Sequence, residues 1–384
     1  MMKLLLISFF LTFHFLLSAT HIVGGVAHYE IVNNTDSLTT EVEITFTLYR
    51  DALSGGADFD ADAFFGAFIS NQDGTTSFFD MQVANPSIVT DSIIGSQFRI
   101  QSAEYIVRFD FPKGSDYIIS YQRCCRAENI SNIDNPSASP IGMAIQLEIF
   151  AEALELDINS PSLSELPFAV AASGQPIEYQ LPLESDTLTE VTTFFSSVFI
   201  TGGFDDATGP QMGCCSCLRP DPMSCNPPYD GITYLSNFSG INPLGDQNDI
   251  VINTEGVISG IINISSIYQY GIVIENTLNG TLLSRQLLDN AVNTLVSTST
   301  KEAGLSLDFE IFPNPVSDIL NIAISNSQNL TLEITDTEGR SILKSELNQK
   351  NNIVRLDQLD TGIYFASLSD RKQSYLLTKK FVIE

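Results

Sequence analysis

Residues 42–48 read VEITFTL, and this stretch decides the fold class. Every second side chain in it is apolar, which is the period of a β-strand with one face turned to a core. Residues 145–149, IQLEI, repeat the alternation, and residues 105–111 mix β-branched with aromatic side chains. Both patterns are typical of strands. Turn-forming residues separate these stretches, for example at 54–56, 71–74 and 112–114, so the sequence predicts an all-β protein.

The N-terminus has the form of a secretory signal peptide. Lys3 precedes a mainly apolar run at residues 4–17, and Ser18-Ala19 suits the small-residue cleavage site. A membrane anchor is the alternative, but about twenty apolar residues are needed to cross the bilayer core. We therefore predict that residues 1–19 are removed and that the mature chain has no transmembrane segment.

The C-terminus shows a second set of strands with characteristic turns between them. Residues 320–324 and 330–334 alternate apolar and polar side chains, and turns are expected at residues 336–339 and 360–362. The order F-P-N-P, D-x-x-G, L-x-x-G-x-Y and a basic pair before a final apolar strand resembles the type A C-terminal sorting domain of the type IX secretion system. The resemblance covers residues 307–384. It implies a small β-sandwich whose sorting signal includes Pro313, Asn314, Pro315, Gly339, Gly362, Tyr364, Lys379 and Lys380.

The resemblance to type IX sorting domains implies an export route and a binding partner, the type IX secretion machinery. A chain of this type crosses the inner membrane through its signal peptide, is handed to the type IX secretion machinery, and loses the sorting domain at the surface. We therefore expect a protein of a Bacteroidetes-type bacterium that passes through the periplasm and ends secreted or on the outer cell surface.

The charge distribution limits which classes of molecule we expect the protein to bind. Residues 20–300 hold 34 acidic side chains and 8 basic ones, and the whole chain has a net charge of −28. Nucleic-acid binding depends on basic groups that neutralise phosphates, so no nucleic-acid partner is expected. An acidic surface both attracts divalent cations and keeps a protein soluble, and the sequence does not decide between these two uses.

The body between the two ends shows two groups of strand patterns. Residues near Ser160 and Pro161 become rich in Pro, Ser and Gly, which is typical of a boundary. We therefore predict two β-sandwich modules before the sorting domain. The predicted division is a signal peptide at 1–19, an N-terminal β-sandwich domain at 20–158, a second β-rich domain at 159–293, a linker at 294–306, and the sorting domain at 307–384.

Several motifs of the body support an immunoglobulin-like fold. THIVGGVAHYEIV, ITFTLYRD, YIISYQRCCRAENISNI, CNPPYDGITYLSNFSGINPLG and NGTLLS follow one another between residues 20 and 290. In this order they resemble the N-terminal region of large gliding-motility-associated, immunoglobulin-like surface proteins of Bacteroidetes. In those relatives many further domains follow, whereas here the sorting domain follows directly. The resemblance implies a fold and a location but no residue-level activity.

All six cysteines lie in the body. An even number of cysteines in an exported chain indicates disulfides, and six permit fifteen pairings that the sequence does not rank. A zinc site is the alternative because four of the six are crowded together, but their C-C-x-C-x₇-C spacing lacks the usual C-x₂-C pairs and a nearby His. The disulfide candidates are Cys124, Cys125, Cys214, Cys215, Cys217 and Cys225.

The densest carboxylate run is D-x-D-x-D at Asp58, Asp60 and Asp62. In a loop, alternate carboxylates can converge on Ca²⁺, and we name calcium as the one possible cofactor. The run lacks the glycine and the final glutamate of an EF-hand loop. In a strand, the same three side chains would form a solvated acidic face. Both interpretations stay open at this stage.

The sequence favours a non-enzymatic role. No Ser–His–Asp or Cys–His arrangement is recognisable, and we assign no catalytic residue. We predict a surface-delivered or secreted β-sandwich protein that serves adhesion, binding or envelope structure, with an unknown surface glycan or protein as partner. The alternative is a secreted carbohydrate-active hydrolase, because a pair of carboxylates suffices for that chemistry and sequence spacing does not reveal such a pair.

Overall fold

The computed structural model forms two compact units, Met1–Leu295 and Val296–Glu384. The structure describes residues 22–33, 38–52, 58–94, 98–127, 130–134, 141–165, 167–203, 215, 217, 219–295, 309–324, 330–337, 340–347, 351–356, 359–370 and 376–383. The predicted signal peptide, most of the predicted linker, Cys214 and Gly339 therefore lie outside the described residues. Within the described part, no helix is long and apolar enough to cross a membrane.

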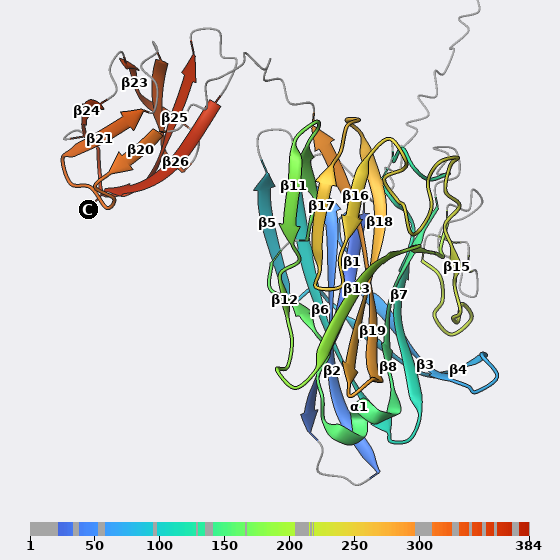
Figure 1. Cartoon of the computed structure of the whole chain (residues 1–384). Coiled ribbons are helices and arrows are strands. Elements are labelled where there is room, and N and C mark those ends of the chain that lie inside the picture. The colour runs from blue at the N-terminus through green and yellow to red at the C-terminus, as the bar shows by residue number, and fades with distance from the viewer. Residues whose placement is uncertain are drawn as a thin grey trace, which may run out of the picture. The chain divides into compact units, whose positions relative to one another are not determined.

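The first unit is built almost wholly of strands (Figure 1). Its elements are β1 (Ile22–Asn33), β2 (Thr39–Asp51), β3 (Ala63–Ser70), β4 (Thr76–Ala84), β5 (Ile88–Ile94), β6 (Phe98–Pro112), β7 (Asp116–Arg123), β8 (Met143–Ile149), α1 (Ala151–Leu156), β9 (Ser162–Leu163), β10 (Val170–Ala172), β11 (Pro176–Gln180), β12 (Leu183–Glu184), β13 (Glu190–Ser196), β14 (Phe199–Ile200), β15 (Asp230–Gly231), β16 (Asp249–Ile252), β17 (Val257–Ile261), β18 (Ile267–Leu278) and β19 (Thr281–Leu295).

The predicted strands are confirmed where the alternation was clearest. In β2, the apolar side chains at positions 42, 44, 46 and 48 are all completely buried, and the polar side chains between them are partly exposed. β6 and β8 contain the other two predicted stretches. The prediction of an all-β fold is therefore confirmed, with α1 as a single helical turn and a half among the described elements of this unit.

One large sheet runs in the order β4-β3-β7-β8-β19-β1-β2-β6-β5. The main hydrophobic core lies between its two halves, with β3, β7 and β8 on one side and β1, β2 and β6 on the other. A second core lies where β18 and β19 meet the small sheet β11-β17-β16. The arrangement is thus a sandwich extended by a third layer.

The two cores do not follow the predicted boundary at residues 158/159. Leu283, from the second predicted module, lies in the first core. Val23 and Tyr49, from the first predicted module, lie in the second core. β19 joins the two because it pairs with β18 and β8 and also with β1. The division into two modules is therefore not confirmed: strands distant in sequence share one continuous sheet.

The glycine pair in IVGG explains how β1 reaches β19. Gly25 is paired with Asp289 across the two strands. A Cβ atom on Gly24 would lie 1.9 Å from the backbone oxygen of Asp289, a distance that no side chain tolerates. Glycine is needed at this point because two backbones approach each other closely.

The second unit is a small β-sandwich. Its strands are β20 (Phe309–Phe312), β21 (Ile319–Ile324), β22 (Leu330–Thr335), β23 (Ser341–Leu347), β24 (Asn351–Arg355), β25 (Gly362–Asp370) and β26 (Leu376–Ile383). They form a three-stranded sheet, β20-β21-β24, and a four-stranded sheet, β23-β22-β25-β26. Apolar side chains from both sheets fill one core, among them Leu320, Leu332 and Phe381. The predicted small C-terminal sandwich is therefore confirmed.

Candidate functional site

The outward face of the main sheet places three charged side chains in a row. Residues 145, 147 and 149 of β8 point into the core, so Gln146 and Glu148 point outward. Strand register sets Arg285 of β19 opposite Glu148, and Glu275 of β18 opposite Arg285. Side chains that face one another across neighbouring strands are close enough to interact, and this register makes an acid–base–acid row.

Arg285 binds both of its acidic neighbours. Its guanidinium lies 2.8 Å from Glu275 and 3.2 Å from the carboxylate of Glu148. Gln146 donates a hydrogen bond of 3.0 Å from Nε2 to the other oxygen of Glu148. Burial raises the pKa of Glu148, and the ion pair with Arg285 offsets only part of this effect. The row therefore combines two carboxyl groups with one guanidinium, and one of the carboxyl groups resists ionisation.

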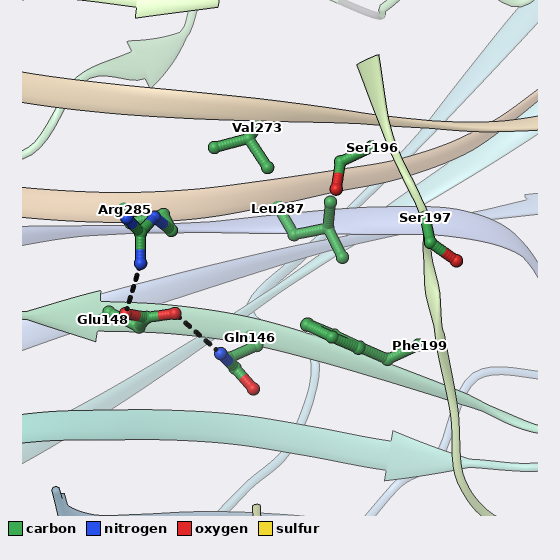
Figure 2. A pocket seen from close by; sticks show the side chains of 8 residues that line it. All are labelled: Gln146, Glu148, Ser196, Ser197, Phe199, Val273, Arg285 and Leu287. Carbon is green, nitrogen blue, oxygen red and sulfur yellow. Dashed lines mark hydrogen bonds and ion pairs between the residues drawn. The ribbon is translucent and has the colours of Figure 1, made fainter. Parts of the chain in front are cut away.

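A pocket opens beside this row (Figure 2). Gln146, Glu148 and Arg285 line it from the sheet, and Val273 and Leu287 supply apolar surface. The chain between Ser196 and Phe199 passes over these strands and forms the other wall, as Figure 2 shows. The space is small, about 40 Å³. It therefore suits a single chemical group rather than a whole sugar ring or nucleotide.

One polar atom in this pocket lacks a partner. Gln146 is 7% exposed, and its Oε1 has no hydrogen-bond partner in the described part of the chain. The orientation of this amide is fixed, because the neighbouring carboxylate of Glu148 accepts hydrogen bonds and must face the NH₂ group. The remaining amide oxygen is a buried acceptor that needs a donor.

The segment QRCCR at residues 122–126 forms a second polar centre, at the end of β7. Cys124 and Cys125 are joined by a disulfide, and both are fully buried. Arg126 is also fully buried and binds both carboxylate oxygens of Asp289, at 2.8 and 2.6 Å. Asp289 is the residue at the β1–β19 crossing, and burial raises its pKa against the opposing effect of Arg126. This ion pair thus lies at the junction of the two cores.

The D-x-D-x-D run is divided between different environments. Asp60 is 5% exposed and lies 3.2 Å from the guanidinium of Arg123 and 2.9 Å from that of Arg219. Asp58 is solvent-exposed and pairs with Arg50 at 2.7 Å. The three carboxylates therefore do not form one solvated face, because the central one is buried against two arginines.

Histidine, cysteine and acidic side chains are the usual metal ligands in proteins. Among those that the structure describes, no three His, Cys, Asp or Glu side chains come together in a group that would hold a metal ion. Asp58 and Asp60 have the separate surroundings described above, Asp62 is exposed, and the calcium site stays a prediction from the sequence alone.

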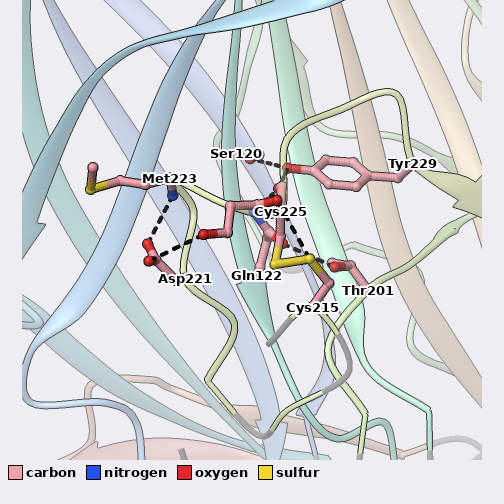
Figure 3. Close-up of a disulfide and its surroundings, with 9 residues drawn as sticks. Ser120, Gln122, Thr201, Cys215, Asp221, Met223, Cys225 and Tyr229 are labelled. Atoms are coloured by element: carbon pink, nitrogen blue, oxygen red, sulfur yellow. Dashed lines mark hydrogen bonds between the residues drawn. A yellow bond between two sulfur atoms is a disulfide. The ribbon is translucent and has the colours of Figure 1, made fainter. Parts of the chain in front are cut away.

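The second disulfide joins Cys215 to Cys225 in the loop that follows β14 (Figure 3). Gln122 of β7 donates a hydrogen bond of 2.7 Å to the backbone oxygen of Cys225 and accepts one of 2.9 Å from Thr201. Cys217 is also disulfide-bonded. The described cysteines are therefore in disulfides, as predicted, and the described part of the chain holds no free cysteine.

The predicted sorting-signal residues meet at one side of the second unit. Asn314, inside the F-P-N-P motif, donates to the backbone oxygen of Lys380 at 3.3 Å and accepts from the backbone N–H of Val382 at 2.9 Å. Lys379 lies 5.5 Å from the ring centre of Phe309. The motif is thus attached to β26, which contains the basic pair. The peptide bonds before Pro313 and Pro315 are cis.

The remaining sorting-signal residues lie on β25 and at its start. Gly362 begins this strand, and Tyr364 donates a hydrogen bond of 2.9 Å from its hydroxyl to the backbone oxygen of Asp360. The ring of Tyr364 stacks on Phe381 of β26. These contacts hold the turn at residues 360–362 against the last two strands.

Comparison with known proteins agrees with this geometry for the second unit. Residues 310–384 match the family described as "Secretion system C-terminal sorting domain". The C-terminal unit is therefore similar to the C-terminal sorting domains of a secretion system. An endo-acting ulvan lyase of Formosa agariphila is 33% identical over 85 residues, which are 22% of this chain and 16% of the lyase.

Two solved structures match this chain with low TM-scores. PorZ, a surface component of the type IX secretion system of Porphyromonas gingivalis, is 12% identical, with 95% of this chain and 45% of PorZ covered and a TM-score of 0.18. A three-domain immunoglobulin fragment of titin is 9% identical, with 95% of this chain and 98% of the fragment covered and a TM-score of 0.16. The chain spans less than half of PorZ.

Sequence reasoning missed the row of Glu148, Arg285 and Glu275. Gln146 and Glu148 were visible only as the polar members of an alternating strand. Their partners lie more than a hundred residues later, and nothing in the local pattern of β19 marks Arg285 as different from another solvent-facing residue. The available signal was that Arg285 is the single basic residue of its strand in a strongly acidic body, which indicates acidic neighbours.

Proposed function

We propose that this protein is a non-enzymatic β-sandwich protein, exported by the type IX secretion system, that serves binding, adhesion or envelope structure at the cell surface. The sorting domain at residues 310–384 is the observation that supports export. A surface glycan or another protein is the proposed partner. The likeness of the body motifs to gliding-motility-associated surface proteins agrees with such a role.

The arrangement of buried charge supports a structural role for the body's polar residues. Arg126 with Asp289, and Arg123 with Asp60, are ion pairs inside the fold. Buried charges need partners because an unpaired one is strongly destabilising. Each member of these pairs is therefore needed to keep its partner from being an unpaired buried charge, and we assign none of them to substrate chemistry.

Fractionation of intact cells tests the export proposal. Cells expressing the full chain should show it at the surface or in the medium. Cells expressing a chain that lacks residues 309–384 should retain the folded body in the periplasm, because the address has been removed. Surface exposure of the truncated chain would contradict the proposal.

A secreted hydrolase is the second candidate. One observation favours it: burial raises the pKa of Glu148, and Arg285 holds a second carboxylate, that of Glu275, close to it, as in a pair of catalytic acids. Replacing Glu148 by Gln in the purified chain, and assaying both forms on a panel of polysaccharides with reducing-end detection, tests it. Hydrolysis that falls by about 100-fold in the variant would favour the enzyme.

A further inference from the structure

The pocket beside β8 has the composition of a cation site. We propose that it binds a primary ammonium group on an aliphatic stem, as presented by a lysine side chain of a partner protein. This inference deepens the proposed binding role and rests on it. The site is lined by the polar and aromatic side chains of Gln146, Glu148, Arg285, Ser196, Ser197 and Phe199, with Val273 and Leu287 beside them.

The side chains of Gln146 and Glu148 offer hydrogen-bond acceptors to a bound group. Gln146 Oε1 is buried and has no partner in the described part of the chain, so it would accept a hydrogen bond from a donor that enters the pocket. Each oxygen of Glu148 has one described partner, Arg285 on one side and Gln146 on the other. A carboxylate has about four acceptor positions, so capacity remains for one more donor. An ammonium supplies three N–H donors and no acceptor, which matches this set.

The local charge also favours a cation. Glu148 and Glu275 share the single guanidinium of Arg285, so the row has an excess of one negative charge when both acids are ionised. An incoming ammonium would remove that excess. It would also favour the ionised form of Glu148, whose charge burial now disfavours. The surrounding body is strongly acidic and attracts cationic partners over a longer range.

The rest of the lining distinguishes an organic ammonium from a metal ion or a sugar hydroxyl. Phe199 presents an aromatic ring, and a cation is attracted to the face of such a ring. Val273 and Leu287 provide apolar surface for methylene groups. The small volume excludes a sugar ring but accommodates the end of a lysine side chain. Amphipathic lysine stems commonly pack in this way, with apolar carbons against apolar walls.

The test uses the purified full chain and two small probes, Nα-acetyl-lysine methylamide and its neutral counterpart Nα-acetyl-norleucine methylamide. Binding is measured by calorimetry and by ligand-observed NMR at matched ionic strength. We expect the lysine probe to bind at least about tenfold more tightly than the norleucine probe, because only the ammonium makes charge-assisted hydrogen bonds. Equal affinities would overturn the proposal.

Two variants locate the site. Glu148→Gln should weaken the lysine probe by about tenfold while the chain stays folded, because the replacement has nearly the same shape. Glu155→Gln, which makes the same charge change at an exposed position of α1, should leave the affinity within about twofold. An equal loss in both variants would show diffuse attraction to an acidic surface and would overturn the assignment.

A third probe separates the possible sources of the ammonium. Glycine methylamide offers an amino-terminal ammonium without a long stem. We expect it to bind more weakly than the lysine probe, because it does not reach Val273 and Leu287. Equal binding would overturn the assignment to a side chain. A chain that reaches the cell surface but ignores the lysine probe loses this pocket assignment alone, whereas failure of the fractionation test removes the proposed surface role.

Discussion

The two units of the chain bury different kinds of side chain. The first unit encloses four charged residues, Asp60, Arg123, Arg126 and Asp289, together with many buried amides and hydroxyls. The described residues of the sorting domain bury only apolar side chains and one tyrosine ring. The first unit thus depends on specific polar pairings, whereas the second depends on apolar alternation between two small sheets.

The two units therefore specify their structures through different interactions. Asp289 lies at the point where β19 crosses β1, and only one register places its carboxylate against Arg126. A register shift would leave two buried charges unpaired, which is a large penalty. In the sorting domain, the strand pattern and the turns suffice, and for this reason the domain is recognisable from sequence.

The largest expected effect follows from breaking the buried pair. Asp289→Ala leaves the guanidinium of Arg126 buried without its carboxylate, so the free energy of unfolding of the first unit should fall by about 3–5 kcal/mol. Urea denaturation of the full chain, followed by intrinsic tyrosine fluorescence, measures this loss. Asp249→Ala, at an exposed position of β16, is the matched control. A loss below about 1 kcal/mol at position 289 would contradict the role given to the pair.

The corresponding change in the sorting domain is the removal of an apolar side chain. Leu332 is completely buried, and Leu332→Ala should destabilise the second unit by about 2–5 kcal/mol through lost burial and the cavity left behind. Its unfolding transition should move while that of the first unit stays in place. Calorimetry of the full chain resolves the two, and movement of both transitions together would indicate a single cooperative fold.

Removing a disulfide should also affect one unit only. All six cysteines lie between residues 124 and 225, so the double variant Cys215→Ala with Cys225→Ala changes the first unit. We expect a loss of about 2–4 kcal/mol there, because the bridge restricts the unfolded chain. The sorting domain serves as the internal control in the same thermal scan. An unchanged first transition would show that the loop does not support the sandwich.

The smallest expected effect is a pH dependence at the pocket. Burial raises the pKa of Glu148 above its ordinary value of 4.5, so the folded state binds this proton more tightly than the unfolded state. Its contribution to stability is therefore present below pH 4.5 and is lost as the pH rises through the folded-state pKa. The stability of the wild type relative to Glu148→Gln should fall over this window. A difference that rises with pH would contradict the direction of the shift.

The features that could be predicted from the sequence are those that depend on residues close together in the chain. Strands β2, β8, β21 and β22 have alternating side chains, and alternation depends only on local spacing. The F-P-N-P motif identified the sorting domain for the same reason.

Interactions between distant residues were not predictable in this way. Arg126 and Asp289 are 163 residues apart, and no local pattern joins them. The D-x-D-x-D run suggested a loop site or a solvated face because its neighbours in space, Arg123 and Arg219, come from other parts of the chain. The proposed boundary at residues 158/159 likewise relied on local composition, whereas pairing by β19 decides how the sheet continues.

We infer that the first unit holds its own fold through its polar pairings and that the sorting domain acts only as an address. Calorimetry of a chain lacking residues 309–384, compared with the full chain, tests this directly. We expect the transition of the first unit at an unchanged midpoint, within about 2 °C, and loss of the sorting domain's transition alone. A midpoint lowered by about 5 °C or more, or a truncated chain that does not fold, would contradict the claim.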